Sequence, residues 1–272
     1  RRRQFGLMGN PSGVGVYIDA NRVFVVELVK EGGSTRLARW GEAEFSATSV
    51  DSNSEGKTVS QAVRNALEKS GVTSKITAAA LPARDCIVRY FDIPMIPKKE
   101  WTDAVRFEVQ KYILWNLNDL SSGFEVFPDK SQKKLGILFL ASKNEIIQQH
   151  LKLLSDAGLE AHYLEPAPLS FVRALRGSKS RRVNETSALV DLRANGMMSI
   201  AVIKNDRILM ARDSFLLQAE GGHRLAEELP SFDDFVKEIR LTFNFFNKNF
   251  KGDEIKRILF IPKKENFFES WT

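Results

Sequence analysis

Two strand–turn–strand runs, one near each end of the chain, constrain the fold most strongly. The first covers residues 13–30, GVGVYIDANRVFVVELVK, with Val, Ile and Phe on both sides of a polar turn. The second covers residues 188–207, ALVDLRANGMMSIAVIKNDR. Runs of β-branched and aromatic residues around a polar turn are typical of β-hairpins. A helix and a strand are expected after each hairpin, so the sequence predicts two related α/β lobes.

The first lobe continues with a strand at 36–46, a Ser/Asp/Gly loop at 50–57 and a helix from Thr58. Apolar residues recur at helical spacing in this segment, and Gly71 is a suitable residue to end the helix. An apolar strand at 75–81 follows. We therefore expect the first lobe to comprise residues 1–81 plus 165–180.

An inserted α+β unit is predicted at 82–164. After a strand ending at Pro94, a helix carries a one-sided row of apolar residues: Trp101, Val105, Val109 and Tyr112. Two further strands flank a Lys-rich turn at 130–134. Ser142 and Glu145 have the spacing of a capping box that opens the next helix. A last strand, LEAHYLEP, closes the unit.

A polar, basic linker at 176–185 leads into the second lobe, residues 181–272. Ser231 again has capping spacing, and an apolar stripe rich in Phe from Phe232 to Phe250 predicts a long helix with a core-facing side. A strand at 255–262 ends the pattern. Whether this lobe is truncated stays open.

Charge and composition exclude several functions. The net charge of +6 permits an anionic partner, but Lys and Arg form no stripe with aromatic residues, so no nucleic-acid binding is expected. The single cysteine, Cys86, excludes an internal disulfide and favours a buried structural thiol. The three histidines lie far apart, so no metal site is predicted. No apolar run reaches the roughly 18 residues of a membrane span. A membrane segment beyond either end, for example after Thr272, stays open.

The inserted unit also carries a recognisable motif. FDIPMIPKKEWTDAVRFEVQKYILWNLNDLSSGFEV contains a strand ending in Ile-Pro and a helix of the pattern A-x-R-x-E-x-x-x-Y-I, here Ala104, Arg106, Glu108, Tyr112 and Ile113. This segment resembles the PilM family, whose relatives include FtsA and GspL, and weaker similarity extends over roughly Gly15 to Pro262. The resemblance implies an α/β actin-like two-lobe fold with an inserted α+β subdomain of the SHS2-like type.

The resemblance also implies a nucleotide site built from two phosphate-binding hairpins and a glycine-rich adenosine loop. Glycine lets backbone N–H groups approach phosphate, and Ser or Thr hydroxyls add donors. In the first hairpin, Tyr17 stands where the family has Asp, and Asp19 where it has Gly. A carboxylate at Asp19 would repel phosphate. The first hairpin therefore argues against nucleotide binding.

The second hairpin keeps Asp191, but Arg193 stands in place of Gly, and Met197 and Met198 in place of Thr. Arg193 could bind phosphate itself or be a surface side chain, and the missing hydroxyls favour the latter. Met197 and Met198 are taken as residues of a turn that no longer encloses a ligand.

The remaining elements of the nucleotide site are degenerate as well. The Gly-Gly of the adenosine loop is replaced by the segment 262–265, where Pro lacks a backbone donor. Gly221 and Gly222 resemble a later family element, but they are too short a glycine signal for a phosphate site. We therefore expect a pseudo-ATPase without enzymatic activity and without ATP or Mg²⁺ as cofactors.

What the resemblance implies for function is a scaffold or adaptor at the cytoplasmic face of the inner membrane, in a type IV pilus or related secretion machine. It would bind the short cytoplasmic tail of an inner-membrane partner beside the inserted unit and contact the assembly ATPase. A ring or other homo-oligomer is among the expected assemblies. Candidate groove residues are apolar groups around the inserted helix: Phe91, Trp101, Trp115 and Phe124.

Two alternatives stay open from the sequence. The chain could be the cytoplasmic domain of a GspL-like type II secretion protein, which shares the degenerate site and continues into a membrane helix. It could also be an active actin-like ATPase, and nucleotide-dependent thermal stabilisation would support that reading.

Overall fold

The computed structural model describes residues 12–19, 21–45, 52–113, 115–178, 180–192, 197–216, 231–250 and 252–261. Contacts between residues divide the chain into two compact units. The first comprises the described residues up to Pro82 together with Lys143–Ala167. The second comprises Ala83–Ser142 together with the described residues from Pro168 onward. Each unit is therefore assembled from segments that are far apart in the sequence.

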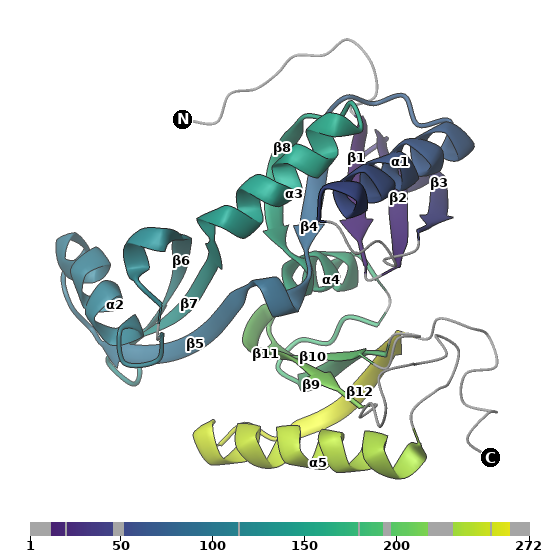
Figure 1. Cartoon of the computed structure of the whole chain (residues 1–272). Coiled ribbons are helices and arrows are strands. Elements are labelled where there is room, and N and C mark those ends of the chain that lie inside the picture. Colours follow the sequence, from purple (N-terminus) through teal and green to yellow (C-terminus); the bar gives the residue numbers. More distant parts are fainter. Residues whose placement is uncertain are drawn as a thin grey trace, which may run out of the picture. The chain divides into compact units, whose positions relative to one another are not determined.

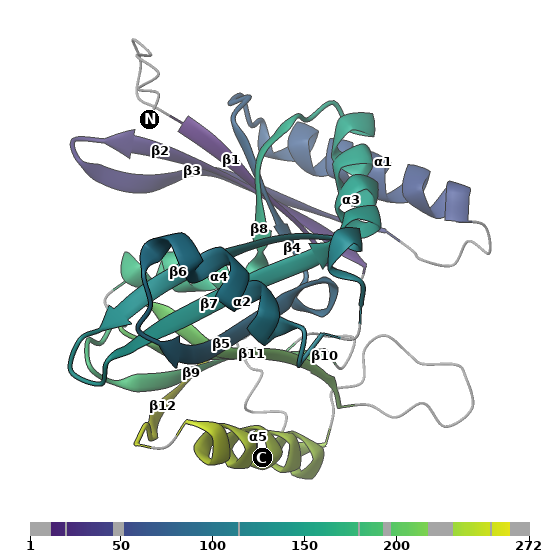
Figure 2. The same ribbon diagram turned by 90° about the vertical axis from the view of Figure 1, so that its left-hand side faces the viewer.

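The first unit is a five-stranded sheet with two helices on one face (Figures 1 and 2). Its sheet order is β3-β2-β1-β4-β8, in which β4 lies parallel to β1, and β8 parallel to β4. The strands are β1 (Ser12–Ile18), β2 (Arg22–Glu31), β3 (Ser34–Glu44), β4 (Thr77–Leu81) and β8 (Ala161–Pro166). The helices are α1 (Ser52–Ser70) and α3 (Asn144–Asp156).

Strand alternation explains the core of this unit. On β1 the alternating residues Val14, Val16 and Ile18 face the helices and are buried, as are Val23 and Val25 of β2. The predicted apolar stripe of α1 covers them, with these residues buried: Val59, Ala62, Val63 and Ala66. A Cβ at Gly41 of β3 would lie 2.8 Å from the Ala66 carbonyl oxygen. The missing side chain at Gly41 therefore allows α1 to pack closely on β3.

Two details of the predicted helices are wrong. α1 begins at Ser52 and not at Thr58, because the expected loop is rich in Ser and Asn, which suit a helix start as well as a loop. α3 begins at Asn144 with Lys143 as its N-cap and no side-chain cap. The Ser142 hydroxyl instead donates to the carbonyl oxygen of Asp85 at 2.7 Å, so the predicted capping box does not form.

The expected domain boundaries also differ from the structure. The predicted inserted unit, 82–164, included α3 and β8, but β8 pairs with β4 and α3 packs on α1 in the first unit. α4 (Ala167–Arg176), which was expected in the first lobe, belongs to the second unit, where Val172 joins its core. The period of an element shows its buried face but not which sheet it will cover.

The second unit contains a seven-stranded sheet of the order β12-β9-β10-β11-β5-β7-β6. The inserted part contributes β5 (Ile87–Pro94), α2 (Trp101–Val109), β6 (Leu120–Asp129) and β7 (Lys134–Lys143). Short 3₁₀ turns lie at Ala83–Asp85, Lys98–Glu100 and Leu117–Asp119. The remaining elements are β9 (Thr186–Leu192), β10 (Met197–Lys204), β11 (Arg207–Phe215), α5 (Phe232–Asn249) and β12 (Ile255–Ile261).

The two units repeat one arrangement, as the sequence predicted. In the first unit the order β3-β2-β1-β4 joins a meander to a parallel strand, and in the second the order β11-β10-β9-β12 does the same. The third strand of the second lobe, β11, was not predicted from the sequence. Asn205 and Asp206 have φ of 51° and 61°, the left-handed conformation of a tight type I′ hairpin turn, and this Asn-Asp pair was its signal.

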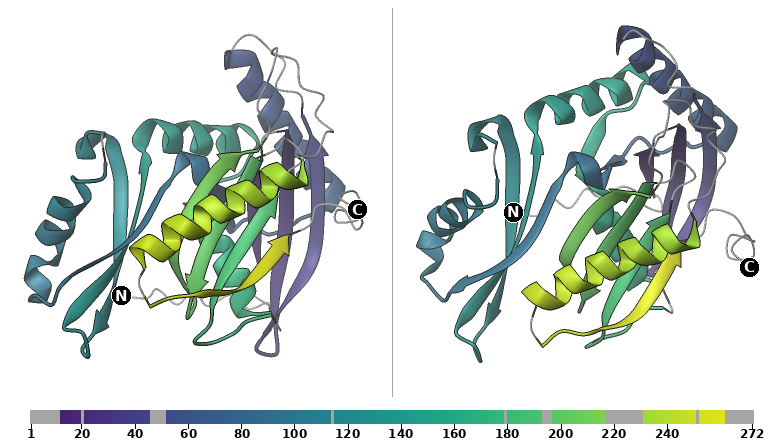
Figure 3. Two further views of the ribbon diagram at one scale, coloured as in Figure 1. Left: turned by 90° about the horizontal axis from the view of Figure 1, so that it is seen from below. Right: turned by 60° about the horizontal axis from the view of Figure 1, so that its bottom comes forward.

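α5 lies across the strands of the second lobe (Figure 3). The predicted cap is confirmed, because the Ser231 hydroxyl accepts a hydrogen bond from the Asp234 N–H at 3.1 Å. The aromatic stripe is core, with Phe235 and Phe246 buried, whereas Phe232 is 52% exposed at the first position of the helix. No helix among the described residues is long and apolar enough to cross a membrane.

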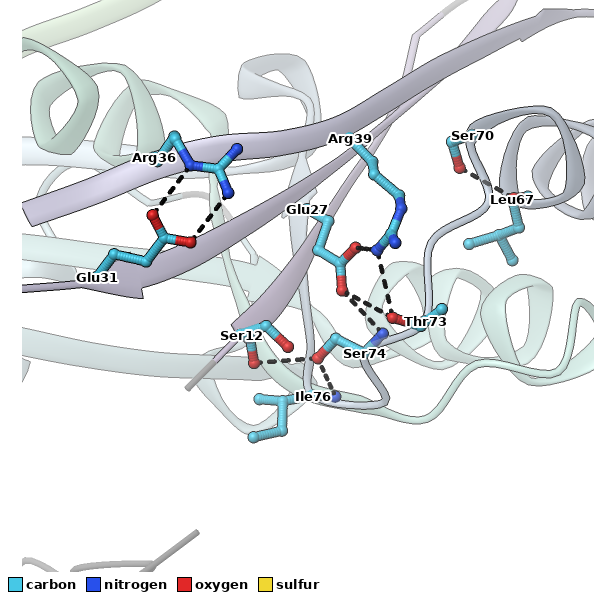
Figure 4. A network of polar contacts seen from close by, with 10 residues as sticks. All are labelled: Ser12, Glu27, Glu31, Arg36, Arg39, Leu67, Ser70, Thr73, Ser74 and Ile76. Carbon is cyan, nitrogen blue, oxygen red and sulfur yellow. Dashed lines mark hydrogen bonds and ion pairs between the residues drawn. The ribbon is translucent and has the colours of Figure 1, made fainter. Parts of the chain in front are cut away.

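A buried carboxylate joins three segments of the first unit (Figure 4). Glu27 of β2 is 1% exposed, and its carboxylate accepts from Arg39 Nη1 at 2.6 Å and from the Ser74 N–H at 3.0 Å. The Ser74 hydroxyl donates in turn to the Ser12 carbonyl oxygen at 3.0 Å. The network thereby fixes the loop before β4 against β2 and β3.

Candidate functional site

The turn between β1 and β2 is the first of the two predicted remnants of a phosphate hairpin. Tyr17 is half-buried in β1 between Phe24 of β2 and Ala80 of β4. The N–H of Asp19 donates to the Arg22 carbonyl oxygen at 2.8 Å, which closes the turn, and Asp19 is only 7% exposed. A buried carboxylate at this turn would repel a phosphate group, and the absence of nucleotide binding stays a prediction.

The second remnant lies at the end of β9. Asp191 is 4% exposed in a strand that pairs with β10 on one side and β12 on the other. Met197 and Met198, interpreted from the sequence as turn residues, are instead the first residues of β10 and are 1% and 0% exposed. Met198 packs in the core beneath α5. Their side chains therefore fill the protein interior and do not border an open turn.

Several predicted site residues lie outside the described residues. These are Arg193, Gly221, Gly222 and the segment 262–265 that takes the place of an adenosine loop. Their roles stay predictions. The two strands of the second hairpin, β9 and β10, are both described, and their pairing is therefore established up to the turn.

Strand pairing reveals a polar row that the sequence analysis missed. Ser199 of β10 lies opposite Asp191 of β9 and opposite Asp213 of β11, so the three residues cross neighbouring strands in register. The Ser199 hydroxyl donates to Asp213 Oδ1 at 2.6 Å, while Asp213 Oδ2 is buried without a hydrogen-bond partner. Only the register brings these residues together, because 22 positions separate Asp191 from Asp213.

The chemistry available around this row is limited. Burial, and next the charges of Asp85 and Asp213, raise the pKa of the Cys86 thiol to about 12, which leaves it protonated and unreactive at neutral pH. Burial also raises the pKa of Asp85. The described residues contain no group of three His, Cys, Asp or Glu side chains placed to hold a metal ion. The row of Asp191, Ser199 and Asp213 therefore has the residue types of a polar contact that stabilises the sheet.

The four predicted partner-groove residues separate into two kinds. Phe91, Trp101 and Phe124 pack against the core between α2 and the β5–β7 strands. The Trp101 Nε1–H donates to the Ile96 carbonyl oxygen at 3.1 Å, as a buried indole usually requires. Trp115, in contrast, is 45% exposed in the segment between α2 and β6. Trp115 is therefore the residue of this set with the most surface to offer a partner.

Two lobes that repeat the same strand order, with an α+β unit inserted between them, define a protein of the actin-like fold class. The sequence profile of the type IV pilus assembly protein PilM family matches residues 15–239. The chain belongs to this family. No curated protein sequence matches the chain.

The chain is also similar to solved structures. The PilM of a PilM–PilN type IV pilus biogenesis complex superposes with a TM-score of 0.64 at 20% identity, over 85% of this chain and 66% of that one. The chain thus spans slightly less than two thirds of that relative, and the match confirms the predicted fold class. Weaker similarity, at a TM-score of 0.49 and 11% identity, links 85% of this chain with 95% of the cytoplasmic domain of EpsL, an inner-membrane component of the Vibrio cholerae type II secretion system. A Bacteroides thetaiotaomicron protein with an actin-like ATPase fold has a TM-score of 0.46 at 9% identity, over 95% of this chain and 94% of that one.

Proposed function

We propose that this chain is a non-catalytic adaptor of a type IV pilus or related secretion machine, at the cytoplasmic face of the inner membrane. It binds the short cytoplasmic tail of an inner-membrane partner and contacts the assembly ATPase, in a ring or other homo-oligomer. Membership of the PilM family supports the pilus role. The related solved complex pairs PilM with PilN, and the proposal transfers that type of pairing to this chain.

The observation that carries the non-catalytic part is the burial of Met197 and Met198. Hydroxyl side chains at these positions would have to face a nucleotide to donate hydrogen bonds to its phosphates. Here the thioether side chains are 1% and 0% exposed, and Met198 contributes to the core under α5. A nucleotide would gain no hydroxyl donor from these two positions, and the buried carboxylate of Asp19 at the first hairpin turn would repel a phosphate group.

Titration of the purified chain with Mg-ATP in a calorimeter tests this part. No heat of binding and no phosphate release above a blank are expected. A nucleotide that binds the folded state raises the melting temperature, by an amount that grows with the logarithm of its concentration over Kd, so thermal unfolding with and without Mg-ATP provides an independent measurement. Binding at micromolar concentration would overturn the loss of nucleotide binding, and phosphate release above the blank would establish an active ATPase.

Co-purification tests the adaptor part. When the inner-membrane partner is co-expressed, deletion of its cytoplasmic tail is expected to abolish co-purification, and retention of binding without the tail would contradict the proposal. Trp115→Ala is expected to weaken the complex, because Trp115 is 45% exposed beside α2. Trp40→Ala provides the matched control, since Trp40 is 62% exposed on β3 of the first unit.

A further inference from the structure

A depression of about 1400 Å³ lies along β5 in the second unit, and we call it the β5 depression. Its walls come from β5, the facing residues 209–212 of β11, the end of α2, the β6–β7 hairpin, the β10–β11 turn and the end of α5. Its volume exceeds the roughly 300–1,000 Å³ of typical small-molecule sites. A segment of polypeptide therefore suits its size better than a metabolite does.

The depression borders a largely unpaired strand edge. Arg89 and Phe91 line it from one face of β5, and Tyr90 and Asp92 line it from the other. Successive side chains of a strand point to opposite faces of the sheet. Both sets can therefore border one depression only if that depression lies beside the edge of the strand. On one side β5 pairs with β7 along its whole length, from Ile87 to Pro94. Towards β11, the ladder between the described residues contains one pair, Arg89 with Met210.

Hydrogen-bond alternation identifies which backbone groups face this edge. The N–H of Met95 donates to the Lys133 carbonyl oxygen at 3.0 Å, so odd-numbered residues of β5 direct their backbone groups towards β7. Even-numbered residues, including Asp92, direct theirs towards the depression. Pro94 is also even-numbered, and a strand tolerates Pro where the missing N–H would face an open edge. An extended peptide can hydrogen-bond to such an edge.

The floor of the depression is aromatic and closely packed. The ring of Tyr90 lies 6.4 Å from that of Phe127 and 6.3 Å from that of Phe250. Tyr90 crosses β7 above Gly136, where an added Cβ would lie 2.7 Å from Tyr90 Cζ. Glycine at 136 thus creates the space for the ring. Apolar side chains of a bound segment would find a preformed surface here.

Positive charge dominates the rim. Three lining cations have carboxylate partners: Lys134 pairs with Asp92, Lys204 with Asp253 and Arg212 with Glu238. Among the described residues, the other four lining cations have no carboxylate within ion-pair distance: Arg89, Lys130, Arg207 and Lys248. Glu108 is paired with Lys111, whereas Asp129 accepts hydrogen bonds only from the neutral donors Ser131 and Gln132 and keeps its negative charge. The four cations without a carboxylate partner outnumber it. The charge left over is therefore positive.

Two of these cations are already oriented. The Arg207 guanidinium lies 4.1 Å from the centre of the Phe127 ring, and that of Arg89 lies 5.8 Å from the centre of the Tyr112 ring. A guanidinium over a ring loses little side-chain freedom on binding, and its fork of N–H donors matches a carboxylate. Carboxylates are consequently the groups that this rim is best prepared to receive.

We propose that the β5 depression binds an extended acidic peptide segment of a protein partner. The peptide lies along the β5 edge, its carboxylates contact Arg89 and Arg207, and an apolar or aromatic side chain packs on the floor near Tyr90. This site is additional to the tail contact proposed above and does not depend on it. Single-stranded nucleic acid suits the depression less well. Arginines cover the rings that bases would stack on, and carboxylates line the same walls.

Selection from a random peptide display library on the full chain tests the proposal. Selected peptides are expected to be rich in Asp and Glu with an apolar or aromatic anchor. Resynthesised with a fluorophore, they should bind at least about tenfold more weakly to Arg89→Glu/Arg207→Glu, as expected when charge pairing across an interface is reversed. Arg89→Gln/Arg207→Gln should give an intermediate loss, and unchanged melting temperatures would verify that both variants fold.

Lys237→Glu/Arg240→Glu is the matched control, because it makes the same charge change on exposed residues of α5 outside the depression. This control should retain full binding. Equal loss in the control, selection of peptides without acidic residues, or displacement of the peptides by oligothymidylate would each overturn the proposal. These outcomes do not depend on the tail-deletion experiment, so each proposal can still be tested if the other one fails.

Discussion

Glu27→Ala is expected to destabilise the protein far more than Glu31→Ala, although each removes one Glu–Arg pair between β2 and β3. The Glu27 side chain is 2% exposed and accepts from Arg39 and from the Ser74 N–H. Glu31 accepts from Arg36 at 3.0 and 3.2 Å, but these side chains are 44% and 57% exposed. Figure 4 shows both pairs. The comparison contrasts a buried carboxylate that also accepts a backbone hydrogen bond with an exposed one that is paired with Arg36 alone.

The magnitude follows from what each substitution leaves behind. A buried donor that loses its acceptor costs about 1–3 kcal/mol, and here the Ser74 N–H is left in that state. Losing the charged hydrogen bond to Arg39 adds about 1 kcal/mol, since the 44% exposed Arg39 recovers contact with water. We expect Glu27→Ala to lower the free energy of unfolding by about 2–4 kcal/mol. Solvent screens the exposed Glu31 pair, so its removal should have a much smaller effect.

Urea unfolding at pH 7, followed by far-UV circular dichroism, measures the difference. Hydrogen exchange of peptides from β2, β3 and the loop before β4 locates it in the first unit. Equal losses for the two variants, or a loss below about 1 kcal/mol for Glu27→Ala, would refute the reasoning, because a buried acceptor would then be no more important than an exposed one.

Acid provides a second measurement on the same residue. Burial alone would raise the pKa of Glu27, but hydrogen bonds from Arg39 and the Ser74 N–H, with the charge of Arg39, hold that pKa below its usual 4.5. A carboxyl group with a lowered folded pKa contributes stability that is present above the unfolded value and is lost as pH falls through the folded one. The advantage of the natural chain over Glu27→Gln should therefore disappear in acid. An advantage that persists at pH 2 would contradict this assignment.

Three further predictions test the packing. Burial lowers the pKa of His150 to about 4 from 6.5, so between pH 6.5 and pH 4 the natural chain should lose up to about 3 kcal/mol more than His150→Leu does. Acid titrations of both chains in parallel measure this difference. Gly136→Ala should lower the free energy of unfolding in urea by about 1–3 kcal/mol, because the new Cβ collides with the Tyr90 ring. Adding Tyr90→Leu to the same chain should restore most of that loss. Phe246 is 0% exposed, and its ring is stacked 4.7 Å from that of Phe250. Phe246→Ala should therefore lower the free energy of unfolding by about 3–5 kcal/mol, whereas Leu241→Ala, at a residue that is 51% exposed, should be nearly neutral. Similar losses for both variants would contradict the core role of the apolar stripe of α5.

The elements themselves were largely predictable, because they depend on residues close together in sequence. The hairpin around Asp19, the cap at Ser231 and the apolar stripe of α5 all formed as expected. The exception at Ser142 has a distant cause. Ser142 had the right spacing for a cap, but its hydroxyl donates to the carbonyl oxygen of Asp85, 57 residues away, and a rule based on neighbouring residues does not include such a partner.

Family membership was predictable for a similar reason. The motif from Ala104 to Ile113 and the order of the elements indicated the family. Other positions were less predictable. Met197 and Met198 were placed in a turn from the sequence, whereas the structure buries both in β10. The Asn205–Asp206 turn that creates β11 was overlooked, although its residues favour the left-handed conformation.

The sequence by itself determined the elements, the two-lobe repeat and the PilM family. Tertiary structure alone decided which sheet α3 and β8 join, the register that aligns Ser199 between Asp191 and Asp213, and the depression along β5. Local periodicity identifies a face that must be buried, but many partner faces can satisfy it. The choice is made by contacts such as the Ser60 hydroxyl on the Leu153 carbonyl oxygen, 93 residues away, because their free energies are gained only when the whole unit closes.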